Sequence, residues 1–101
     1  MILEMLILKE DGGGEEFAII LPRTNIYDAR QKAEDLRKRI SEYSFSNIEE
    51  EEPIRITISA GVAGSEYEDI MGKADEHLYM AKNSGRNRVC PLPEALKSNN
   101  H

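Results

Sequence analysis

The sequence has 101 residues, of which 40% are hydrophobic and 32% charged, so it suits one globular domain and is not a disordered chain. Its formal net charge of −6 argues against binding to duplex nucleic acid without sequence preference, because such proteins neutralise phosphates with clustered Lys and Arg. A single nucleotide, held by a few local cations or a metal ion, remains compatible with an acidic chain.

The first elements in the chain are predicted to form a β-hairpin. An apolar run over residues 2–8 stops at the turn-forming cluster of residues 11–14, and a second apolar run over residues 17–21 ends at Pro22. Two short apolar runs around a glycine cluster are typical of two strands joined by a turn. Neither run alternates cleanly between apolar and polar residues, so both strands are expected to be buried on both faces.

A helix is predicted over residues 26–40, because apolar residues recur there at spacings of three and four. Thr24 or Asn25 can cap its first turn. The stretch over residues 41–53 is polar and rich in acids, and is expected to form a solvated loop.

The second half of the chain is predicted to add a strand, a helix and a short strand. Apolar residues alternate over residues 54–62, as in a strand. Ser65 and Glu68 suggest a capping box for a helix that ends at Gly85, a typical C′ residue. A strand over residues 87–90 completes the order ββαβαβ. This order indicates an α+β (mixed α/β) fold with one β-sheet and two packing helices.

The C-terminal end and the single cysteine bear on the class of protein. Residues 91–101 are polar and without periodicity, and are expected to form a tail. Cys90 alone cannot form an intramolecular disulfide, and no apolar run is long enough for a membrane span or a signal peptide. We therefore expect a cytoplasmic protein that does not insert into a membrane.

The first group of residues that could carry chemistry is Gly13-Gly14-Glu15-Glu16 at the hairpin turn. Glycines allow a ligand to approach the backbone closely, and carboxylates bind Mg²⁺ together with substrate phosphates. An ordinary glycine hairpin with solvated glutamates explains the same residues. If Glu15 and Glu16 both have strand geometry they point to opposite faces, so at most one aims directly at an ion.

The second group is Lys82 and Arg86, which flank the end of the second predicted helix. Two cations there could converge on the phosphates of a ligand. They could equally offset the negative end of the helix dipole. Taken alone, this pattern favours the structural explanation.

In combination and in this order, the two groups resemble the GGDEF domains of diguanylate cyclases. The signature is present as the GGEEF variant at residues 13–17. The strand Ile56-Thr57-Ile58-Ser59-Ala60-Gly61-Val62-Ala63 is similar to a further family strand, and residues 74–89 are similar to the family's closing block with AD, LY, AK and GRN. The resemblance covers about residues 13–89. Residues 1–90 are therefore expected to form a partial GGDEF domain with a nucleotidyl-cyclase-like fold.

The resemblance implies a signalling transferase that joins two GTP molecules into cyclic di-GMP with release of pyrophosphate. It implies that Gly13 and Gly14 lie against the guanine and ribose, that Glu15 binds Mg²⁺ (or Mn²⁺) near the reacting 3′-hydroxyl, and that Glu16 supports the site. It also implies that Lys82 and Arg86 contact the phosphates. Each domain holds one GTP, so a homodimer is implied for the reaction.

The segment upstream of the signature departs from the family pattern. The family carries there a strand with an aspartate metal ligand and residues that recognise guanine, and nothing in residues 1–12 matches them. We expect a C-terminal part of the domain that is inactive alone; the alternative is a degenerate module that binds nucleotide or protein without catalysis. The absent strand also predicts a gap between the hairpin and the strand around residues 56–62, and hence association into dimers or higher oligomers. The apolar segment at residues 1–8 could swap into a neighbour or close the gap itself.

Overall fold

The computed structural model describes residues 2–44, 52 and 54–97, and the account below concerns these residues. Their elements are, in chain order, β1 (Leu3–Glu10), β2 (Glu16–Pro22), α1 (Ile26–Glu42), β3 (Ile58–Gly64), α2 (Ile70–Asn83), β4 (Val89–Cys90) and α3 (Pro93–Lys97). The predicted order is confirmed, and α3 is an addition that lies in the expected tail. None of these helices is long and apolar enough to cross a membrane.

All four strands belong to one sheet with the order β2-β1-β3-β4. β1 pairs antiparallel with both β2 and β3, and β3 pairs in parallel with β4. No gap separates the hairpin from the following strand, because β1 fills that place; of the two alternatives for residues 1–8, closure of the gap within the chain is the one observed. The sheet is continuous without any added strand.

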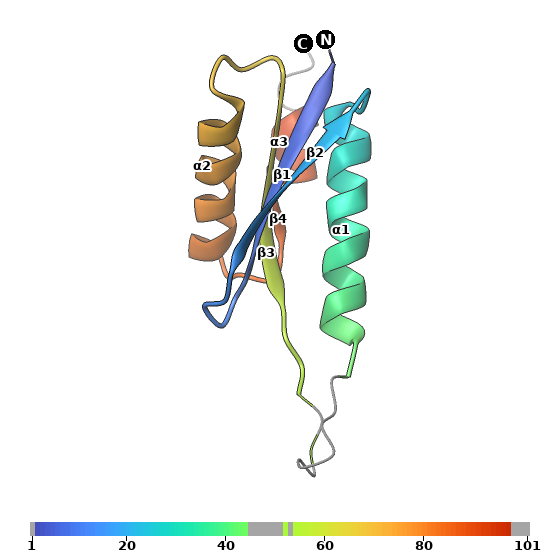
Figure 1. Ribbon diagram of the computed structural model, residues 1–101, viewed down its shortest axis with the longest axis vertical. Helices are drawn as coiled ribbons and strands as arrows, with labels where there is room; N and C mark the ends of the chain where they lie inside the picture. Colours follow the sequence, from blue (N-terminus) through green and yellow to red (C-terminus); the bar gives the residue numbers. More distant parts are fainter. Residues whose placement is uncertain (1, 45–51, 53, 98–101) are drawn as a thin grey trace.

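The two long helices cover opposite faces of the sheet (Figure 1). Successive side chains of a strand point to opposite faces, and β1 supplies both cores in this way. Leu6 and Leu8 belong to the cluster that contains Ala29 and Ala33 of α1. Ile7 belongs to a second cluster with residues of α2, among them Leu78. Burial of each large side chain stabilises the fold by roughly 1.5 to 3 kcal/mol.

Gly61 lets α2 lie directly against β3. A Cβ atom at this position would collide with the backbone of α2 at Ala74 and Leu78. Any larger residue would therefore push the helix away from the sheet. The close packing fixes where the C-terminal end of α2 lies relative to β1.

β2 differs from the prediction because it is an edge strand with exposed side chains. Phe17 is 53% exposed and Ile20 is 59% exposed, whereas β1 is largely buried. The reason is the strand order, in which β2 has a neighbour on one side only. A continuous apolar run does not by itself reveal which of two paired strands is central.

Several element boundaries also differ from those predicted. β3 begins at Ile58, which lies opposite Glu10, the last residue of β1. The N-cap of α2 is Asp69, whose side chain accepts a hydrogen bond from the Gly72 amide, so the capping box at Ser65 and Glu68 was wrong. Of the two residues predicted to cap α1, Thr24 and Asn25, Asn25 is the N-cap. α1 reaches Glu42, and most of the predicted acidic loop lies outside the described residues.

Candidate functional site

The turn between β1 and β2, residues 11–15, is held by the side chain of Glu10. Its carboxylate accepts hydrogen bonds from the backbone amides of Gly12 at 2.9 Å and Gly14 at 3.0 Å. Gly13 between them has a φ of 99°, and no atom lies within 4 Å of the place that a Cβ atom would occupy. The turn therefore presents an open strip of backbone that a ligand can approach closely.

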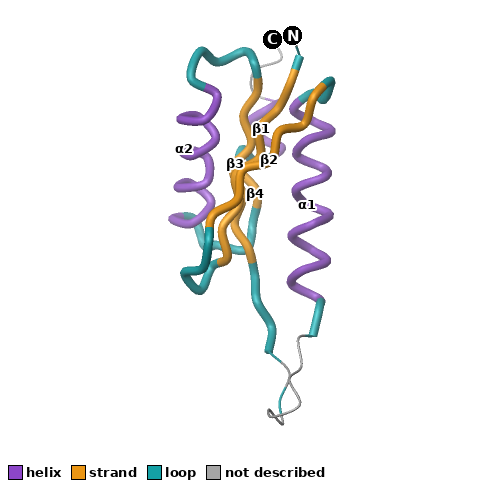
Figure 2. The backbone as a smooth tube through the Cα atoms, viewed as in Figure 1, coloured by secondary structure: helices purple, strands orange, loops and turns teal. Residues whose placement is uncertain are grey.

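Asp11, directly after β1, links the turn to two distant segments. Its carboxylate accepts hydrogen bonds from the hydroxyls of Thr57 at 2.6 Å and Ser59 at 2.5 Å. It also accepts one from the backbone amide of Asn87 at 3.0 Å. The turn and the segment after α2 consequently lie at the same end of the sheet (Figure 2).

The segment after α2, residues 84–88, has an unusual backbone. Gly85, Arg86 and Asn87 have positive φ angles of 131°, 61° and 49°. Non-glycine residues rarely adopt this conformation, so the surrounding contacts must hold it. The Arg86 amide donates to the carbonyl of Ala81 at 3.0 Å, and the Arg88 side chain donates to the carbonyl of Arg86 at 3.0 Å.

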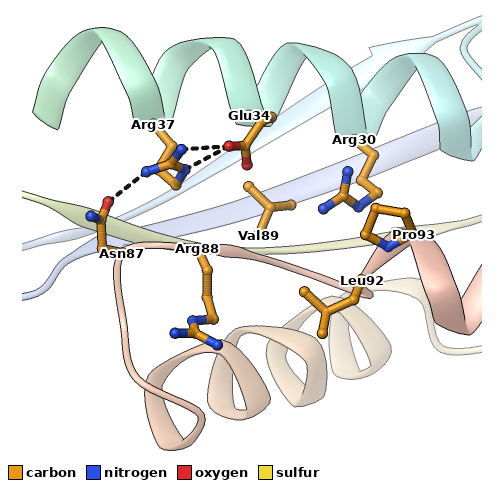
Figure 3. A pocket seen from close by; sticks show the side chains of 8 residues that line it. All are labelled: Arg30, Glu34, Arg37, Asn87, Arg88, Val89, Leu92 and Pro93. Atoms are coloured by element: carbon orange, nitrogen blue, oxygen red, sulfur yellow. Dashed lines mark hydrogen bonds and ion pairs between the residues drawn. The ribbon is translucent and has the colours of Figure 1, made fainter. Parts of the chain in front are cut away.

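A side-chain contact from α1 also holds this segment (Figure 3). Arg37 donates to the side-chain oxygen of Asn87 at 2.8 Å and to the carboxylate of Glu34 at 3.0 Å. The hydrogen bond and charge of Arg37 lower the pKa of Glu34. The three residues border a groove of about 510 Å³ between α1 and the segment that leads to β4. Asn87 is thus fixed by α1 through its side chain and by Asp11 through its backbone.

Lys82 lies on the last turn of α2, beside this network. Burial and the positive charges of Lys9 and Arg86 lower the pKa of Lys82, while the charge of Asp11 acts in the opposite direction. Lys82 also lines a groove of about 390 Å³ along α2, together with Asp75 and Tyr79. The charges of the predicted cations Lys82 and Arg86 therefore act on each other.

The predicted glutamates Glu15 and Glu16 are exposed. The ion pairs of the described residues join Arg37 to Glu34 and Lys73 to Glu76, so neither signature glutamate is paired with Lys82 or Arg86. The structure brings the two predicted groups to one end of the sheet and connects them through Asp11, without direct contact between their charges.

A metal ion could bind here only with help from a ligand. Over residues 2–44, 52 and 54–97, no three His, Cys, Asp or Glu side chains gather to hold a metal. The carboxylates of Glu10 and Asp11 are engaged by the hydrogen bonds described above, which leaves Glu15 free. Mg²⁺ in nucleotide sites commonly takes one or two carboxylates and completes its shell with phosphates and water. The exposed carboxylate of Glu15 fits such a shared site.

The fold is that of a known class of domains. The GGDEF domain of DgcB from Caulobacter crescentus, solved in complex with c-di-GMP, matches with a TM-score of 0.80 at 24% identity, over 88% of this chain and 74% of that one. The active GGEEF domain of a diguanylate cyclase from Vibrio cholerae matches with a TM-score of 0.77 at 26% identity, over 89% of this chain and 82% of that one.

The sequence belongs to the diguanylate cyclase GGDEF domain family, whose model matches residues 12–88. Diguanylate cyclase VdcA of Vibrio cholerae serotype O1 is 44% identical over 85 residues, which cover 79% of this chain and 25% of that protein. Response regulator PleD of Caulobacter vibrioides is 42% identical over 82 residues, which cover 76% and 18%. The chain thus spans a quarter or less of the length of these relatives.

Lys9 and Asp11 were missed as site residues by the sequence analysis. Both precede the residues that the family model matches. The alternation of β1 was the available signal, since it places Met5, Ile7, Lys9 and Asp11 on one side of the strand. The partners of Asp11, which are 46 to 76 residues away, could not be identified from local sequence.

Proposed function

We propose that this chain is the GTP-binding part of a diguanylate cyclase. The reaction is an attack by the 3′-oxygen of one GTP on the α-phosphorus of another, with pyrophosphate as the leaving group. The observation that supports this most directly is the connection between the open signature turn and the cationic segment after α2, made by the hydrogen bonds of Asp11. An acidic turn and a cationic loop at one end of a sheet suit a ligand that carries both a metal ion and phosphates.

Each predicted site residue has a role in this proposal. Gly13 and Gly14 lie against the guanine and ribose; the turn leaves open space at Gly13, and the Gly14 backbone is held beside it by the carboxylate of Glu10. Glu15 is a ligand for Mg²⁺ or Mn²⁺, and Glu16, at the start of β2, supports it. A bound divalent ion would stabilise negative charge on the reacting oxygens. Lys82 and Arg86 neutralise the phosphates; one residue is held by α2 and the other by the constrained segment at 84–88.

Two copies of the site are needed, because each holds one of the two GTP molecules. We propose that two domains meet face to face as a homodimer, with the signature turns toward the shared product. GTP is a cytoplasmic nucleotide, and the proposed location is accordingly the cytoplasm. The exposed edge strand β2 lies next to the turn and offers a surface for contact between copies.

The second candidate function is a module that binds nucleotide without making product. Glu10 and Asp11 are committed to structural hydrogen bonds, which leaves Glu15 and Glu16 as the carboxylates of the turn that could bind a metal ion. Two carboxylates can share one metal ion only if both lie on the same side of the backbone, whereas adjacent residues with strand geometry point to opposite sides. This arrangement favours the second candidate. We therefore expect the 101-residue chain to bind GTP but not to turn it over by itself.

The test is a GTP titration by calorimetry in the presence of Mg²⁺, followed by chromatography for cyclic di-GMP. We expect Lys82→Ala to weaken GTP binding by about tenfold, through loss of a charge-assisted contact. Lys38→Ala, which removes an exposed lysine of α1, is the matched control and should change nothing. Absence of GTP binding would refute the proposed function. Product that disappears in Glu15→Ala would instead show that the chain is active alone.

A further inference from the structure

β1 places side chains at the proposed nucleotide site that the family pattern does not describe. The matched residues begin at position 12, after the last residue of β1. Yet β1 is a central strand, paired on both sides, and it leads directly into the signature turn. The match to the family therefore does not cover the charged side chains of β1, and their place at the site follows from this structure.

Two rows of residues lead to the same point between β1 and α2. On β1, Met5 and Ile7 face α2 and pack in its core cluster. Lys9 follows two residues after Ile7 and so points to the same face. On α2, Leu78 packs in that cluster, and Lys82 follows one turn later on the same side of the helix. The apolar contact between β1 and α2 is therefore followed, toward the signature turn, by the two lysines Lys9 and Lys82.

The positive charges of Lys9 and Arg86 both act on Lys82 and lower its pKa. Of the acidic neighbours, Asp11 acts against this repulsion at Lys82. Asp11 already accepts three hydrogen bonds, and within the described part of the chain the two ion pairs involve none of these three cations. Glu16, opposite Lys9 on β2, and Asp75, in the groove beside Lys82, are further acids at this end, as are Glu10 and Glu15 at the signature turn.

Like charges held together by rigid elements repel each other unless an anion lies between them. At this position each lysine offers up to three donors and Arg86 a planar set of donors, which match several phosphate oxygens. We propose that Lys9 is a third phosphate-binding residue, which completes with Lys82 and Arg86 a site for the di- or triphosphate group of a nucleotide. This inference rests on the proposed function, because that proposal assigns Lys82 and Arg86 to the phosphates.

The site combines one cation from each of three segments, namely β1, α2 and the loop at residues 84–88. Cations on separate segments can contact more than one phosphate group at a time. The ligand class is accordingly a polyphosphate and not a single phosphate.

The test compares binding of inorganic pyrophosphate and of GTP to the full chain and its Lys9→Met variant. Met preserves the unbranched aliphatic stem on β1 and removes the charge. We expect the variant to bind both ligands about tenfold more weakly and with a smaller dependence on salt concentration. Lys9→Arg should retain binding of pyrophosphate. Lys32→Met, at an exposed lysine of α1, is the matched control.

The outcomes separate this inference from the proposed function. If Lys82→Met and Arg86→Met weaken GTP binding while Lys9→Met behaves like Lys32→Met, the role of Lys9 is refuted and the proposed function stands. If the unaltered chain binds neither ligand, both are refuted. Thermal unfolding of each variant, expected to be unchanged, excludes a loss of fold as the cause. An NMR titration should also show the pKa of Lys82 rising in Lys9→Met, since a neighbouring positive charge has gone.

Discussion

Two carboxylates near opposite ends of β1, those of Glu4 and Asp11, differ in their hydrogen bonding. Asp11 accepts three hydrogen bonds from two segments that are distant in sequence. Glu4 is only 3% exposed, and its Oε1 atom has no hydrogen-bond partner within the described residues. The carboxylate directly after β1 thus joins distant segments, whereas the one on β1 is buried with one oxygen atom that has no partner among the described residues.

The neighbours of each carboxylate explain the difference. Asp11 lies beside the start of β3. Thr57, directly before β3, and Ser59, within β3, donate hydrogen bonds from their hydroxyls to its carboxylate. Glu4 lies opposite Gly64, the last residue of β3, which has no side chain and leaves room for the carboxyl group. Burial, together with the negative charge of Glu66, raises the pKa of Glu4 to about 7. Polar compensation is therefore concentrated at the end of the sheet that carries the proposed site.

The largest effect should come from removal of the Asp11 network. In Asp11→Ala, the hydroxyl of fully buried Ser59 and the amide of Asn87 lose their acceptor. We expect the free energy of unfolding to fall by about 2 to 4 kcal/mol, because hydrogen bonds to a charged group are worth about 1.5 to 3 kcal/mol. Urea denaturation measures this loss.

The matched control is Asp35→Ala on α1, where an exposed aspartate accepts one hydrogen bond, from Gln31. Its removal should cost less than about 0.5 kcal/mol. Asp11→Asn retains one carbonyl oxygen as an acceptor and should lie between the two. Equal losses for Asp11→Ala and Asp35→Ala would mean that the network does not stabilise the fold.

The opposite carboxylate should show its effect through pH. A folded pKa near 7, above the ordinary value of 4.5, means that the folded state keeps the proton of Glu4 after the unfolded state has released it. The contribution of this group to stability is complete below pH 4.5, falls between about pH 4.5 and 7, and is lost above pH 7. We expect Glu4→Gln to be more stable than the unaltered chain by about 1 to 2 kcal/mol at pH 8, with little difference at pH 4.5.

Chemical denaturation across this pH range tests the expectation, with Glu68→Gln as a control at an exposed carboxylate in the loop before α2. The control should follow the pH profile of the unaltered chain. A Glu4→Gln profile that also runs parallel to it would show that Glu4 has an ordinary pKa and that the two ends of β1 do not differ in this respect.

The elements themselves could be predicted from the sequence because their signals are local. The spacing of apolar residues revealed both long helices, and Gly85 proved to be the residue after the C-cap of α2. The place of β1 between β2 and β3 could not be predicted, since it depends on pairing between residues about 55 positions apart. The burial of Glu4 follows from the same pairing, and nothing in its sequence neighbourhood indicates it.

The candidate site divides in the same way. The signature turn and the pair of cations were recognisable from residue types and spacing. The contacts that position them were not, because Asp11 and Asn87 act through partners far away in the sequence. The strained backbone at residues 85–87 was also hidden, since Arg and Asn do not by themselves indicate positive φ angles.

The smallest predicted effect concerns the outer end of the Asp11 network, where Arg37 contacts Asn87. Arg37→Met retains the aliphatic packing and removes the guanidinium, while Asn87→Gly removes the acceptor and accepts the positive φ of 49° without strain. A double-mutant cycle in urea should give a coupling of about 0.5 to 1 kcal/mol, the usual net value of one such hydrogen bond. Arg30→Met with Asn87→Gly is the control cycle, because Arg30 donates to the carbonyl of Pro91 instead, and its coupling should be close to zero. Equal coupling in both cycles would show that α1 does not hold the segment at 84–88 through Asn87, and that the polar network of the signature end stops at Asp11.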